Sequence, residues 1–135
     1  NDLSSSAVSD PTANPTDTTL YTLTETITAT GCQNSNSVTV IVNSLPAAFT
    51  GTDQTICENS NVQIGTIAVG GNTYNWVPST DLSLASASDP IASPTTTTTF
   101  ILTETITATG CQKSNSVTIN VNPAPAANAG IDQTI

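Results

Sequence analysis

The chain has 135 residues, and its ten acidic side chains face a single basic one, Lys113, with no histidine. A formal charge of −9 disfavours nucleic acid and anionic membrane surfaces, because both attract cationic side chains. No apolar run approaches the roughly 18–20 residues that a transmembrane helix needs. We therefore expect no nucleic-acid partner and no membrane insertion.

A long internal repeat organises the sequence. Residues 1–56 align without a gap to residues 80–135 at an offset of 79, and 37 of the 56 pairs are identical. The best-matched stretch, "LTETITATGCQNSNSVT" at 23–39, recurs at 102–118 with one letter changed. Self-similarity at a fixed period is typical of tandem arrays, so we expect the chain to be a window cut from a longer array.

Two Pro-rich stretches mark the predicted boundaries. "NSLPAAFTG" (43–51) and "NPAPAANAG" (122–130) follow strand-like runs and show no alternation of apolar and polar residues. They predict three parts: residues 1–43 as the C-terminal part of a preceding repeat, 46–122 as one complete repeat, and 124–135 as the first strand of the following one. Short Pro/Ala-rich connections favour a stiff, extended array.

The first predicted strand is "YTLTETITA" (21–29), in which apolar residues and threonines alternate. "TGCQNSNS" then predicts a hairpin turn, and the following run alternates valine with polar residues. "NVQIGTI" (61–67) and "NTYNWV" (72–77) predict two further strands, and 100–109 and 117–121 repeat the first pair.

About seven short strands without any helical period predict an all-β fold, an immunoglobulin-like antiparallel sandwich. The predicted core consists of Trp76, Phe100, Leu102, Ile106, Val117, Ile119 and Val121.

Several motifs in order carry a family resemblance: "AANAGIDQTI", then Tyr74-Asn75-Trp76, "TTTTTFILTETITATGC" and "NSVTINVNP". Together they resemble the PKD-like repeats of large Bacteroidota surface proteins, including type IX-secreted gliding-motility adhesins. The resemblance implies a PKD-like sandwich on the cell surface or outside the cell. The sequence departs from typical PKD domains where "WVPSTDL" (76–82) replaces WDFGDG.

Catalysis is disfavoured because histidine and arginine, the usual general bases and anion partners, are missing. The carboxylates Asp53, Glu58, Asp81, Asp89 and Glu104 are not clustered in the sequence. We therefore expect a protein that is not an enzyme and has no catalytic residues.

Glu25 and its copy Glu104 fall in the apolar phase of their strands, where a lone buried carboxylate is costly. A strand bulge or hydrogen bonds from backbone amides would explain them. The alternative is a calcium ligand, with Asp53 or Asp132 as oxygen partners. No other cofactor and no other metal site is expected.

The three cysteines, Cys32, Cys57 and Cys111, indicate an oxidising, extracytoplasmic setting. The resemblance implies a Cys57–Cys111 disulfide within the complete repeat, with the partner of Cys32 outside the chain. However, in a seven-strand sandwich the two turns that carry Cys57 and Cys111 lie at opposite ends. On that topology the disulfide would instead join adjacent domains.

These observations predict a structural spacer in a long extracellular adhesin or surface filament. Its expected partners are neighbouring repeats of the same protein, and the repeats could also assemble into filaments. The alternative is a carbohydrate-binding module repeated for avidity on surface polysaccharide, which would require aromatic side chains on an exposed platform.

Overall fold

The structure is a computed structural model that describes residues 2–134. The chain divides into two compact units, Asn1–Ser44 and Leu45–Ile135, called unit 1 and unit 2 below. The described residues form eight strands and no helix, which confirms the all-β prediction. No helix among them is long and apolar enough to cross a membrane.

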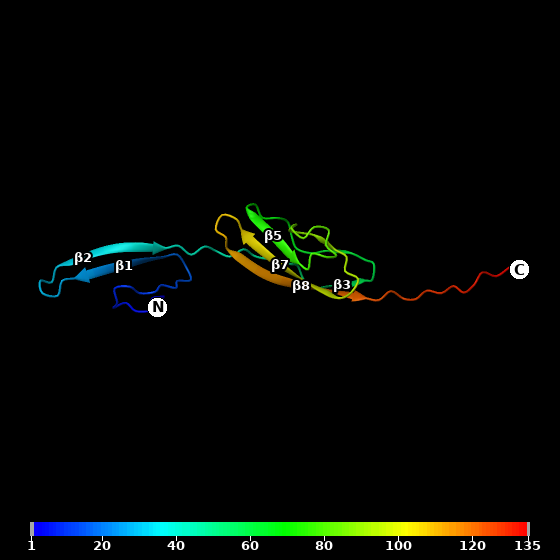
Figure 1. Cartoon of the computed structure of the whole chain (residues 1–135), viewed down its shortest axis with the longest axis horizontal. Coiled ribbons are helices and arrows are strands. Elements are labelled where there is room, and N and C mark those ends of the chain that lie inside the picture. The colour runs from blue at the N-terminus through cyan, green and yellow to red at the C-terminus, as the bar shows by residue number, and fades with distance from the viewer. Residues whose placement is uncertain (1, 135) are drawn as a thin grey trace. The chain divides into compact units, whose positions relative to one another are not determined.

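Unit 1 is built on one antiparallel hairpin (Figure 1). Its strands β1 (Thr19–Thr26) and β2 (Gln33–Val40) pair continuously along their whole length. The turn is closed by the amide of Ile27, which donates to the carbonyl of Cys32 at 2.9 Å. The predicted hairpin is therefore present, but its turn is shorter than predicted, because residues 33–37 of the predicted turn belong to β2.

Unit 2 contains two sheets. The larger has the order β3-β8-β7-β5 and the smaller pairs β4 with β6. The strands are β3 (Gln54–Cys57), β4 (Val62–Gln63), β5 (Asn72–Val77), β6 (Ile91–Ala92), β7 (Thr98–Ile106) and β8 (Gln112–Asn122). Figure 1 shows β5, β7 and β8 side by side, with β3 at the far end of β8.

The strand directions depart from the antiparallel prediction at one place, because β3 pairs with β8 in parallel. The segment that precedes β3 enters unit 2 near the β7–β8 hairpin, where Ala48 contacts Glu104. β3 therefore runs in the same direction as β8. The pairs β5–β7, β7–β8 and β4–β6 are antiparallel.

One hydrophobic core lies between the two sheets of unit 2. Its buried members are Ile64, Trp76, Ala92, Phe100, Leu102, Val117 and Ile119. Five of the seven predicted core residues are in this cluster. Ile106 and Val121 are only half-buried, because each lies at an end of its long strand, beyond the cover of the two-residue strands β4 and β6. The prediction that these two belong to the core is wrong.

Gly65 shows how tightly the core is closed. Its φ is +80°, and a Cβ atom there would lie 2.0 Å from the carbonyl oxygen of Ser88 and 3.2 Å from the indole of Trp76. A side chain would meet backbone as well as the central tryptophan, in a conformation that glycine adopts at least cost. No pattern in the sequence singles out this glycine.

The Pro-rich stretch at 43–51 does alternate, contrary to the prediction. Pro46, Ala48 and Thr50 are buried, whereas Ala47 and Phe49 are exposed. Apolar periodicity does not reveal this alternation, because small side chains, rather than large apolar ones, occupy the inward positions. These residues are therefore packed into unit 2.

Candidate functional site

The most unusual side chain in unit 2 is Glu104, a carboxylate on the central strand β7 that is only 3% exposed. Its Oε2 accepts a hydrogen bond of 2.6 Å from the amide of Ala48, and its Oε1 accepts one of 2.7 Å from Nδ2 of Asn72. Both carboxylate oxygens thus have a donor, which offsets the cost of burial.

No bulge accommodates Glu104. It pairs in unbroken register with Tyr74 on β5 and Lys113 on β8. Of the two structural explanations raised by the sequence, hydrogen bonding of the carboxylate is the one observed. Ala48 has a φ of +49°, a region that costs a non-glycine residue about 1–2 kcal/mol, and the bond to Glu104 holds it there.

Sequence reasoning found Glu104 but missed Ala48 and Asn72. One signal was available for Ala48, because "PAA" recurs at 46–48 and 125–127 with the same period as Glu25 and Glu104. No pattern in the sequence indicates Asn72, which reaches Glu104 only because β5 and β7 are neighbours.

The calcium candidates are not brought together. Asp53 lies beside Gln54, which pairs with Ile119, whereas Glu104 pairs with Lys113, six residues away along β8. At about 3.3 Å per strand residue the two carboxylates are some 20 Å apart. Asp53 instead accepts a 2.8 Å bond from the amide of Thr118. Within residues 2–134 no cluster of three potential metal-binding side chains exists.

Asp132, the remaining calcium candidate, lies in residues 123–134, which form no strand. It has the same place in the repeat as Asp53. Among residues 2–134 the structure places it in no cluster with Glu104.

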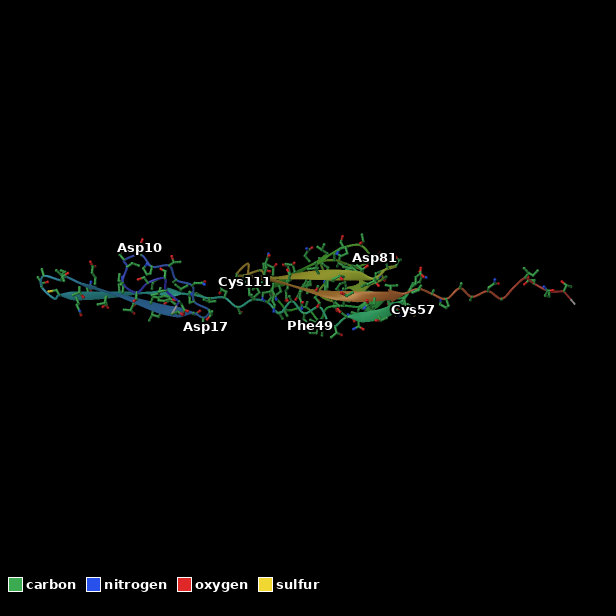
Figure 2. The ribbon with its side chains drawn as sticks, turned by 90° about the horizontal axis from the view of Figure 1, so that it is seen from below. Asp10, Asp17, Phe49, Cys57, Asp81 and Cys111 are labelled. Carbon is green, nitrogen blue, oxygen red and sulfur yellow. The ribbon has the colours of Figure 1, made fainter. Side chains whose placement is uncertain are left out.

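The positions of the cysteines contradict the predicted Cys57–Cys111 disulfide within the complete repeat. Cys57 ends β3 opposite Asn122, while Cys111 directly precedes β8 in the hairpin at its other end. The eleven residues of β8 span about 35 Å, far beyond the Cα separation of about 7 Å that a disulfide allows. Figure 2 shows the two at opposite ends of unit 2. Both are free thiols, as is Cys32.

The aromatic side chains do not form an exposed platform in unit 2. Trp76 is fully buried and its Nε1 donates to the carbonyl of Ala87 at 3.0 Å. Tyr74 is half-buried, and its hydroxyl accepts a 2.7 Å bond from the amide of Val69. Phe49 is the one aromatic residue of this unit that is exposed, at 55%.

Unit 1 has an open groove of about 560 Å³ along its hairpin. Its apolar lining includes Leu3, Val8, Tyr21, Leu23, Val38 and Val40. The hydroxyl of Tyr21 is buried there with no hydrogen-bond partner in the described part of the chain. The residues at the matching repeat positions in unit 2, Phe100, Leu102, Val117 and Ile119, surround Trp76. The groove therefore corresponds to the half of a core that unit 1 lacks.

Three further carboxylates that the sequence singled out, Glu58, Asp81 and Asp89, lie outside the strands of unit 2. Glu58 accepts a 3.3 Å bond from the amide of Ala124, and Asp89 accepts a 3.1 Å bond from the side chain of Gln63. Asp81 is exposed, with a φ of +65° in the segment before β6. Glu58 and Asp89 thus each link segments of unit 2 that are far apart in the sequence.

Comparison with models of known protein families gives no match, and no curated protein matches the sequence.

Proposed function

We propose that the chain is a non-catalytic spacer: immunoglobulin/PKD-like sandwich domains repeated every 79 residues in a long extracellular adhesin or surface filament. In this proposal unit 2 is one complete domain, unit 1 is the C-terminal part of another, and residues 124–135 begin a third.

The observation that carries the proposal is how firmly the incoming segment is joined to unit 2. Besides the bond from Ala48 to Glu104, the hydroxyl of Thr50 donates to the carbonyl of Ser116 at 3.1 Å. The carbonyl of Thr50 accepts a 2.9 Å bond from the amide of Gly65. A domain fixed almost from its first residue leaves a short connection, and a short Pro-containing connection restricts bending.

Surface chemistry supports the same reading. Ten acidic groups and one basic group give the chain a strong net negative charge, and such charge keeps proteins soluble and disfavours lateral association. Hydroxyl pairs cover the outer face of the hairpin strands, such as Thr103 with Ser114 at 2.9 Å. A strongly acidic surface with hydroxyl-lined strands suits a spacer.

Repeated carbohydrate binding has less support. Sugar-binding modules stack aromatic faces on the ligand, but Trp76 packs in the core and the hydroxyl of Tyr74 is bonded to backbone. Phe49 alone does not make a platform.

The proposal is tested by measuring how the length of the molecule changes with the number of repeats. Residue 135 has the same repeat position as residue 56, so residues 57–135 can be appended after Ile135 in phase, once or twice. A spacer should increase the maximum dimension, measured by small-angle X-ray scattering, by a constant 40–50 Å or so per added period. This estimate combines a strand of the length of β8 with a short extended connection.

Growth that falls well below this increment, as flexible or collapsed chains give, would contradict the spacer. Binding to a glycan array that strengthens with each added period would favour the carbohydrate-binding alternative. A matched control is the doubly extended chain with Pro123, the exposed proline that follows β8, and its copies in the added periods replaced by glycine, which should loosen the connections and lower the increment.

A further inference from the structure

The two cysteines of unit 2 occupy its two ends. Cys57 is exposed at the end of β3, opposite Asn122, and the amide of Glu58 donates to the carbonyl of Asn122 at 2.8 Å. Cys111 is half-buried in the β7–β8 turn, where its carbonyl accepts a 2.9 Å bond from the amide of Ile106. Both positions are therefore tied to the sheet while both sulfur-bearing residues keep contact with solvent.

The chain enters unit 2 at the Cys111 end and leaves it at the Cys57 end. Entry is fixed by Ala48, whose amide bonds to Glu104, and Glu104 pairs with Lys113 only two residues from Cys111. The exit follows Asn122, the pairing partner of Cys57. A following domain of the same sequence would therefore present its Cys111 position towards the Cys57 of the domain before it.

The covalent reach of the chain agrees with a bridge. From Asn122 to Ala127, the repeat counterpart of Ala48, there are five residues, which span at most about 16–18 Å. In unit 2, Cys111 lies two residues before the Glu104–Lys113 pair along the hairpin, a distance of about 7 Å. Subtracting this distance from the reach of the connection leaves about 9–11 Å between the Cα atoms of the two cysteines when the connection is fully extended. A somewhat shorter connection brings this separation within the disulfide limit of about 6.8 Å.

The turn that would receive the bridge is the same in both units. In unit 1 the carbonyl of Cys32 accepts from the amide of Ile27 at 2.9 Å, as Cys111 accepts from Ile106. The amide of Cys32 also donates to the hydroxyl of Thr30, at 3.4 Å. The position of this cysteine thus depends on local sequence alone, and each repeated domain would hold it in the same way.

We propose that each Cys57 forms a disulfide with the Cys111 position of the next domain, so that every junction of the array carries a covalent staple. This rests on the proposed tandem spacer. The two thiols lose two protons and two electrons as the S–S bond forms. A disulfide oxidant, such as oxidised glutathione, accepts them and becomes two thiols. The staple bridges the connection, so tension along the array passes through the disulfide as well as through the Pro-rich segment.

The test uses the full chain with residues 57–135 appended after Ile135. After oxidation with a glutathione redox buffer, non-reducing peptide mapping should find the first Cys57 crosslinked to the Cys111 of the added period. Cys57→Ser in the original chain should abolish that crosslink completely. Cys111→Ser in the original chain, the matched control, should leave it unchanged.

A crosslink between Cys57 and Cys111 of the same period, a disulfide between separate chains, or thiols that stay free under oxidation would each overturn the proposal. The scattering experiment keeps this failure separate from failure of the spacer. Constant growth per period with free thiols would refute only the staple, whereas loss of constant growth would refute the spacer.

Discussion

Residues 23–39 and 102–118 differ at one position, Asn34 against Lys113, yet they lie in different surroundings. Leu23 is 58% exposed and Val38 62%, whereas their counterparts Leu102 and Val117 are each 1% exposed. Glu25 is likewise exposed while Glu104 is buried. Nearly identical strands are thus a surface in unit 1 and a core in unit 2.

The backbone of the two stretches is nevertheless the same. Thr24 pairs with Ser35 as Thr103 pairs with Ser114, and both hydroxyl pairs are 2.9 Å apart. In both turns a glycine amide donates at 2.8 Å to the carbonyl of an isoleucine, Gly31 to Ile27 and Gly110 to Ile106. The comparison separates two causes: local sequence makes the hairpin, and distant residues decide whether its apolar face is buried.

The largest effect on stability should come from truncating a leucine that is buried in unit 2 but exposed at the matching position in unit 1. Leu102→Ala should lower the free energy of unfolding of unit 2 by about 2–5 kcal/mol, the range for a buried leucine. Leu23→Ala should change the free energy of unfolding of unit 1 by no more than about 0.5 kcal/mol, as for surface positions, and amide exchange along β1–β2 measures it. The protein has one tryptophan, and it lies in the core of unit 2, so Trp76 fluorescence in a denaturant titration measures this unit. Equal destabilisation by the two substitutions would contradict the comparison.

An intermediate effect on stability should come from replacing Glu104, compared with its repeat counterpart Glu25. Glu104→Ala would leave the Ala48 amide and the Asn72 side chain without their acceptor, at a cost of about 1–3 kcal/mol. Glu25→Ala should stay within about 0.5 kcal/mol. Glu104→Gln, which keeps one acceptor, should lie between them.

The same fluorescence titration measures the two Glu104 variants, and amide exchange along β1–β2 measures Glu25→Ala. Amide exchange at Ala48 gives a second readout. Exchange at Ala48 should accelerate in Glu104→Ala but not in Glu25→Ala. Unchanged exchange in Glu104→Ala would show that the carboxylate does not hold the incoming segment.

The smallest effect on stability should come from removing the cross-strand hydroxyl pairs that the two units share. Thr103→Val and Thr24→Val each remove one cross-strand hydroxyl pair while keeping the β-branched shape, so each should cost about 0.5 kcal/mol or less. Amide exchange along β1–β2 and β7–β8 measures both. A cost above about 1 kcal/mol in one unit only would mean that these pairs depend on their surroundings after all.

Local sequence determined the hairpins, the apolar faces of the long strands, and the separation of the chain near the Pro-rich stretch. Alternation is read from neighbouring residues, so the amino-acid sequence alone suffices to place Leu102, Val117 and Trp76 on the apolar faces of their strands. The repeat also exposed the matching glutamates and cysteines.

The tertiary structure alone decided the rest, because the deciding contacts join residues far apart in the chain. Glu104 is satisfied by Ala48 and Asn72, 56 and 32 positions away. Ile106 and Val121 lose their place in the core because the covering strands β4 and β6 are short. Cys57 and Cys111 are separated because β3 runs parallel to β8 and ends where β8 ends. Sequence periodicity reports which face of a strand is apolar, but only the pairing of distant strands fixes what meets that face and which end of a domain each turn occupies.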